Sequence, residues 1–169
     1  RIRPAKKSLS LYRTGRTREK KPVPLSLVLL APLFEVSSQR SPLNLPPKIW
    51  FSLARICLPF VTVVENTLPL DALDQKIAES HPRDIFIPTR IYKELFKLID
   101  SINSTPQTLE QPILLIVASN DQVVNPNAAK EWIKKRATQS KIIELPRSGH
   151  LIPLDTQWIN ATREAIHFI

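Results

Sequence analysis

Residues 112–124 read PILLIVASNDQVV, and this stretch decides the fold. Six apolar residues, 113–118, follow one another without interruption, and four polar residues, 119–122, come directly after them. An uninterrupted apolar run of this length is typical of a strand that is buried on both faces of a parallel sheet. The stretch therefore predicts a buried strand that delivers a polar loop at its C-terminal end.

The residues that follow predict a helix and a second strand. Asn125 is a good N-cap, and Pro126 suits the first helical position, so we expect a helix that runs to about Ala137. Residues 141–145 (KIIEL) then form a short apolar-centred strand, which ends in the polar segment 146–150 (PRSGH). The second strand, like the first, thus delivers a polar loop.

Asp155 is expected to cap a final helix, whose stripe consists of Trp158, Ile159, Thr162, Ile166 and Ile169. The order strand, helix, strand, helix is a βαβα unit, in which the strands are parallel and the crossover is right-handed. Both polar loops then lie at one edge of the sheet. In open α/β sheets, this is the edge at which ligands bind.

Asp121 follows the first of these strands and His150 follows the second. Neighbouring parallel strands lie about 4.8 Å apart, so the two loops can bring a carboxylate to an imidazole. A carboxylate that accepts the Nδ1 proton fixes the histidine tautomer and leaves Nε2 free to act as a general base. Gly149 is expected to allow the tight turn that presents the histidine.

These residues resemble a known family. Ile113–Val124 (ILLIVASNDQVV) and Ile142–Leu151 (IIELPRSGHL) are similar to the C-terminal end of the α/β-hydrolase fold, in the branch of monoglyceride lipases, lysophospholipases and S33 serine aminopeptidases. The resemblance implies that Asp121 is the catalytic acid and His150 the base. It also implies hydrolysis of a carboxylic ester of the acylglycerol or lysophospholipid kind, with amides or peptides as an open alternative.

The resemblance covers about residues 22–169 and divides the chain into four parts. Residues 1–21 are a basic arm without an expected fold, and 22–36 hold a core strand. Segment 37–110 is a helical cap, and 111–169 form the βαβα part of the hydrolase core. The expected fold is thus the C-terminal part of an α/β hydrolase, with about three parallel strands, flanking helices and an inserted cap.

Three features support this division. The apolar run at 25–31, closed by Pro32, favours a buried strand, with a helix as the competing interpretation. Residues 49–60 and 91–99 carry apolar stripes at helical spacing, and Thr89 is a plausible N-cap for the second stripe. Segment 37–110 is therefore expected to be mainly helical, with irregular links.

The nucleophile of the family is missing from this sequence. It lies in a Gly-x-Ser-x-Gly elbow that needs small flanking residues, and the chain has two glycines, Gly15 and Gly149. Ser119 and Ser148 lie in the acid and base loops themselves, so neither is expected to replace it. We therefore expect the chain to be inactive alone. Its incomplete sheet is expected either to aggregate or to pair with a complementing N-terminal half.

The charge of the chain points to a rival interpretation. Of the net charge of +9, residues 1–21 contribute +8, since they hold nine basic residues and Glu19. Such an arm predicts weak, salt-sensitive contact with polyanions or an anionic membrane. No helix-turn-helix, RNA-recognition or zinc pattern accompanies it, so no specific nucleic acid is expected. A non-catalytic interaction protein that binds polyanions through the arm is the alternative function.

The remaining residues set limits on cofactors and location. One cysteine, Cys57, and three scattered histidines leave no zinc-finger cluster, so neither a metal nor a cofactor is implied. Cys57 is expected to be a small buried hydrophobe on a helix face. Trp132 and Trp158 are expected to pack against the sheet. Without a long apolar run, a transmembrane helix is not expected, and the predicted location is the cytoplasm.

Overall fold

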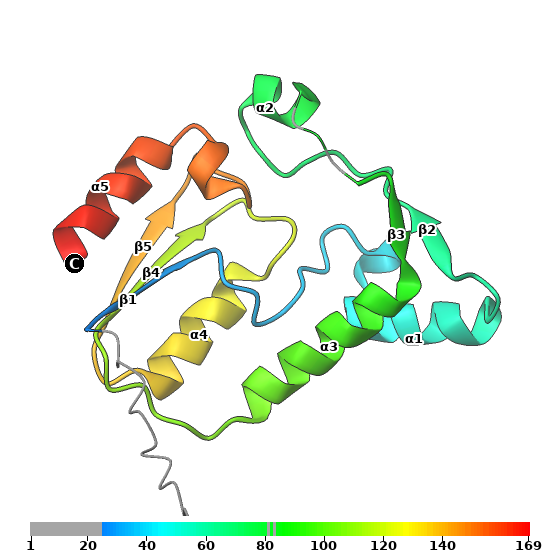
Figure 1. The fold of residues 1–169 in the computed structure, drawn as a ribbon, viewed down its shortest axis with the longest axis horizontal. Coiled ribbons are helices and arrows are strands. Elements are labelled where there is room, and N and C mark those ends of the chain that lie inside the picture. Colours follow the sequence, from blue (N-terminus) through cyan, green and yellow to red (C-terminus); the bar gives the residue numbers. More distant parts are fainter. Residues whose placement is uncertain (1–24, 81, 83) are drawn as a thin grey trace, which may run out of the picture.

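The computed structural model describes residues 25–80, 82 and 84–169. Its centre is a three-stranded parallel sheet in the order β1 (Leu27–Leu30), β4 (Ile113–Ala118) and β5 (Ser140–Leu145) (Figure 1). Leu27 is paired with Ile113, and Ile113 with Ser140. The predicted fold class, an α/β fold with three parallel strands and flanking helices, is confirmed. The predicted arm, 1–21, lies outside the described residues.

The middle strand, β4, is buried along its whole length because helices cover both faces of the sheet. Leu114 and Ile116 pack with Ala161 of helix α5 (Trp158–Phe168). The alternate residues Ile113 and Leu115 point to the other face, where they pack with helix α4 (Pro126–Arg136). Helices on both faces explain why the strand is apolar throughout and does not alternate with polar residues.

Helices α4 and α5 begin in different ways. Asn125 caps α4 as predicted, because its side chain accepts hydrogen bonds from the backbone N–H groups of Asn127 and Ala128. The prediction that Asp155 caps α5 is wrong. Helix α5 begins at Trp158 with Gln157 as its N-cap. Asp155 instead ends the 3-10 turn η2 (Ile152–Leu154), and its carboxylate accepts hydrogen bonds from loop N–H groups.

The part of the chain between β1 and β4 lies to one side of the sheet (Figure 1). Its helices are η1 (Pro42–Asn44), α1 (Pro47–Cys57), α2 (Gln75–Ser80) and α3 (Thr89–Ser104), and its strands are β2 (Val63–Glu65) and β3 (Phe86–Pro88). The strands β2 and β3 pair antiparallel, and the sequence did not predict this ribbon. Pro88, not Thr89, is the N-cap of α3; the Thr89 hydroxyl instead donates to the carbonyls of Val61 and Thr62.

Helices α1 and α3 are joined by ring contacts and an ion pair. The Phe51 ring lies 5.9 Å from that of Tyr92 and 5.6 Å from that of Phe96. At the surface, Lys48 pairs with Asp100 at 2.6 Å. The ring contacts pack the inner sides of the two helices against each other.

Three predictions about burial are wrong. Strand β1 is not fully buried, since Leu30 is 42% exposed, and β4 is the only described strand that pairs with it. Cys57 is exposed because α1 packs on one side only. Trp158 is about half exposed, since α5 contacts the core through Ala161, Ala165 and Phe168, whereas Trp132 stacks on Phe34 at 4.2 Å. No helix of the described part of the chain is long and apolar enough to span a membrane.

Candidate active site

Asp121 and His150 meet at the C-terminal ends of β4 and β5. Asp121 Oδ2 lies 3.0 Å from His150 Nδ1, the distance of a hydrogen bond. The aspartate side chain is 1% exposed, whereas that of the histidine is 29% exposed. The structure therefore brings together the two residues that the sequence singled out, with the carboxylate inside and the imidazole at the surface of the site.

The loop after β4 fixes the orientation of the Asp121 carboxylate. Its Oδ1 accepts the backbone N–H groups of Val123 at 2.9 Å and Val124 at 2.8 Å. The other oxygen, Oδ2, is thereby directed to the imidazole. An ionised carboxylate can only accept, so the proton lies on Nδ1 and the Nε2 atom of His150 keeps a free lone pair. This is the tautomer that a general base requires.

The loop after β5 is held by a second buried carboxylate, Asp155. It accepts the N–H of Gly149 at 2.6 Å and also the N–H groups of Leu73, Asp74 and Thr156. Burial by itself would raise the pKa of Asp155, but these backbone donors outweigh burial and lower it. The carboxylate thus holds the histidine loop and the chain near residue 73 together.

Gly149 is required for a different reason than the sequence suggested. Its backbone does not adopt the left-handed conformation, so the tight-turn explanation is wrong. A Cβ atom at this position would lie 2.6 Å from the carbonyl oxygen of Asp71 and 2.8 Å from its Oδ1. Glycine is needed because Asp71 packs directly against the residue before the histidine.

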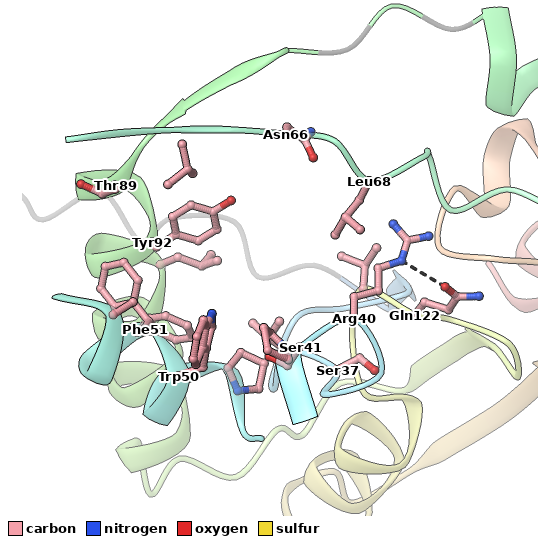
Figure 2. Close-up of a pocket in the computed structure, with 18 of the residues that line it drawn as sticks. Ser37, Arg40, Ser41, Trp50, Phe51, Asn66, Leu68, Thr89, Tyr92 and Gln122 are labelled. Atoms are coloured by element: carbon pink, nitrogen blue, oxygen red, sulfur yellow. Dashed lines mark hydrogen bonds between the residues drawn. The ribbon is translucent and has the colours of Figure 1, made fainter. Parts of the chain in front are cut away.

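A cavity of about 620 Å³ lies beside His150, between the sheet edge and helices α1 and α3. Figure 2 shows Trp50, Phe51, Tyr92 and Leu68 around it, with Arg40 and Gln122 at one end. Most of the lining is apolar, and burial raises the pKa of the Tyr92 hydroxyl. A site with an imidazole at the wall of an apolar cavity can hold a hydrocarbon chain next to a general base.

Among the described residues, Ser119, Ser148 and His167 form no side-chain hydrogen bond with Asp121 or His150. Ser148 is fully buried and its hydroxyl has no partner among the described residues. Ser119 is exposed, and so is His167 on α5, while His81 lies outside the described residues. In the part of the chain that the structure describes, no group of His, Cys, Asp or Glu side chains could hold a metal ion. The sequence missed Asp71 and Arg40, because neither belongs to a local motif.

The parallel sheet and its flanking helices form part of an α/β-hydrolase fold. The model of the family described as "Serine aminopeptidase, S33" matches residues 12–157, so the chain belongs to this family. None of the curated protein sequences compared with the chain matches it.

Three solved structures share the fold. The monoacylglycerol lipase of Paleococcus ferrophilus has a TM-score of 0.62 at 18% identity, over 84% of this chain and 56% of that one. A structure reported with the metagenome-derived lipolytic enzymes LipS and LipT has a TM-score of 0.64 at 16% identity, over 85% and 54%. A soluble variant of the monoglyceride lipase of Saccharomyces cerevisiae, bound to a substrate analog, has a TM-score of 0.64 at 15% identity, over 84% and 51%. The chain thus spans a little over half the length of these structures.

Proposed function

We propose that this chain carries the acid and base of a serine-dependent hydrolase of carboxylic esters. The observation that carries the proposal is the hydrogen bond of 3.0 Å between Asp121 and His150 beside an apolar cavity. His150 Nε2 would take the proton of a serine hydroxyl as it attacks the ester carbonyl. The same proton would then go to the leaving alkoxide, while Asp121 stabilises the imidazolium that forms between the two steps.

The cavity supports an ester with a hydrocarbon chain as the substrate. Its lining from α1 and α3 is mainly apolar, and two of the similar structures are named as lipases of monoacylglycerols. An acylglycerol or lysophospholipid-like ester is therefore the proposed class. In this proposal, segment 37–110 is the cap that covers the acyl chain, 22–36 hold a core strand, and 111–169 complete the hydrolase core.

The nucleophile would come from a polypeptide segment other than residues 1–169. The sequence has no serine in Gly-x-Ser-x-Gly context. Without a nucleophile and oxyanion donors, a base gives little acceleration of acyl transfer, so the chain alone would be inactive. Among the described strands, only β4 pairs with β1. A complementing N-terminal half would add its strands to the other side of β1.

The test has a sequence step and a kinetic step. The DNA that precedes the codon for Arg1 is read in all frames for a glycine-flanked serine. Hydrolysis of p-nitrophenyl butyrate is then measured for the chain alone and for the chain joined to that upstream segment. We expect turnover only in the joined protein. Asp121→Asn should lower kcat by about four orders of magnitude because it favours the wrong tautomer of His150.

Two controls make this result specific. Asp100→Asn makes the same chemical change at an exposed residue of α3 that pairs with Lys48, and it should leave turnover unchanged. His150→Ala should lose turnover together with Asp121→Asn. A joined protein that hydrolyses the ester equally well with either site variant would contradict the proposal.

The basic arm supports a second candidate, contact with polyanions, which rests on the +8 charge of residues 1–21. Binding to heparin should weaken steeply with salt and should disappear in a chain that begins at residue 22. If no ester is hydrolysed by any form of the protein while this binding is present, the interaction function is favoured over the enzymatic one.

A further inference from the structure

Asp71 binds both halves of the candidate site through one carboxylate oxygen. Its Oδ2 accepts the N–H of Gln122 at 2.7 Å and the N–H of His150 at 3.2 Å. Gln122 directly follows Asp121, so the two donors belong to the acid loop and to the base residue itself. Asp71 is 6% exposed and comes from the segment between β1 and β4, far from both loops in sequence.

Arg40 supplies the positive charge that a buried carboxylate needs. Its Nη2 lies 3.6 Å from Asp71 Oδ1. The same guanidinium donates to the side chain of Gln122 at 3.1 Å, as Figure 2 shows, and to the carbonyl of Pro69 at 2.8 Å. The Arg40 guanidinium is therefore held by three groups, and its positive charge balances the negative charge of the Asp71 carboxylate.

The backbone around Asp71 is tied to the histidine loop as well. The carbonyl of Asp71 accepts the N–H of Leu151 at 3.1 Å and packs against Gly149. In the opposite direction, Asp155 accepts the N–H groups of Leu73 and Asp74. Two buried carboxylates, one from each side, thus clamp residues 71–74 to the loop that carries His150.

We infer that Asp71 is a positioning residue that, with Arg40, sets the distance between Asp121 and His150. The catalytic role of Asp71 rests on the proposed function, whereas its effect on the geometry of the Asp121–His150 pair does not. Removal of the carboxylate leaves two backbone N–H groups without an acceptor in a poorly solvated place. Both loops then relax toward other partners, and the hydrogen bond between the acid and the base is the contact that lengthens.

The experiment uses nuclear magnetic resonance on the chain itself, so it does not depend on ester turnover. The Nδ1–H proton of His150 is assigned by its absence in His150→Gln. Its signal and the exchange rates of backbone amides are then compared in the unsubstituted chain, Asp71→Ala, Asp71→Asn and the control Asp100→Asn. Asp71→Asn keeps the volume and one acceptor oxygen, so it remains informative if Asp71→Ala does not fold.

We expect the protected Nδ1–H signal to be lost in Asp71→Ala and weakened in Asp71→Asn. The amides of Gln122 and His150 should exchange at least about tenfold faster in Asp71→Ala, since each loses its acceptor. The amide of Leu115, within β4, should keep its rate. Asp100→Asn should match the unsubstituted chain in both measurements.

Two results would overturn the inference. In the first, the Nδ1–H signal and both amides stay protected in the Asp71 variants, which would show that the pair is held without this carboxylate. In the second, amides throughout β4 lose protection together with those of Gln122 and His150, which would give Asp71 a role in folding only. Absent ester turnover would instead contradict the proposed function and leave these measurements unchanged.

Discussion

Binding of alkyl chains in the cavity beside His150 can be tested without turnover. A volume of about 620 Å³ lies within the range of sites that bury most of a small ligand. Alkyl glycerol ethers carry the chain and the glycerol of a monoacylglycerol but have no ester bond to hydrolyse. We therefore expect them to bind to the isolated chain, with the alkyl group between α1 and α3.

The size of the effect follows from the apolar lining. Each methylene moved from water into an apolar site contributes about 0.8 kcal/mol, which is about fourfold in Kd. Four added methylenes, from a hexyl to a decyl ether, should thus lower Kd by about 200-fold, or about 3 kcal/mol. Ala54→Phe places a ring in the cavity and should weaken binding of the decyl ether by at least about tenfold, the loss of roughly two methylenes.

Tryptophan fluorescence provides the assay, because Trp50 lines the cavity whereas Trp132 stacks on Phe34 away from it. Each ether is titrated below its critical micelle concentration, and Trp50→Phe should abolish the signal. Ser52→Phe adds the same ring to the same helix at an exposed residue outside the cavity lining and is the matched control. A Kd that does not change with chain length, or equal losses in Ala54→Phe and Ser52→Phe, would refute the reasoning.

Three further predictions concern stability, measured by urea unfolding. Ile133→Ala removes a fully buried side chain between α4 and the sheet and should lower the free energy of unfolding by about 2–5 kcal/mol. The exposed Lys134→Ala should lower it by less than about 0.5 kcal/mol, and equal losses would contradict the packing. Asn125→Ala removes the cap of α4 and also the amide that donates to Glu35 at 2.7 Å, and it should cost about 1 kcal/mol, whereas Asn125→Ser should retain most of the cap. Because the pKa of Asp155 is lowered on folding, its contribution is complete above its ordinary value of 3.8 and is lost as the pH falls below that value. Asp155→Asn should therefore lower stability near neutral pH and flatten the acid decline, and parallel pH profiles would show that the carboxylate contributes nothing.

The parts of the fold that could be predicted from the sequence are those with a local cause. The apolar run of β4 and the cap of α4 each lie within a few consecutive residues, so their pattern is visible without a partner. The strands β2 and β3 have three residues each, too few to show a period, and they form because Val63 pairs with Pro88. A strand defined by a distant partner leaves no signal in its own sequence.

The residues of the candidate site also differ in whether the sequence could predict them. Asp121 and His150 could be predicted to meet because each lies in the loop after a strand of one βαβ unit, and neighbouring parallel strands bring these two loops to one edge of the sheet. Asp71 could not be predicted, since it follows no strand and its contacts depend on the path of the chain between β1 and β4. The close approach of Asp71 to Gly149 leaves a partial signal in the sequence. A glycine before the histidine, with no need for a left-handed backbone, indicates that another segment packs there.

The contacts of Asp71 enlarge the smallest segment of the chain that can form the site. The sheet edge alone places the acid and the base next to each other, but it leaves the N–H groups of Gln122 and His150 without acceptors from β4 or β5. Asp71 supplies both acceptors from the segment that also lines the cavity. A shorter chain of residues 111–169 would therefore keep both candidate catalytic side chains and lose the groups that hold them in register. Reconstitution of the site has to include segment 37–110, because that segment lines the apolar cavity and carries Arg40 and Asp71.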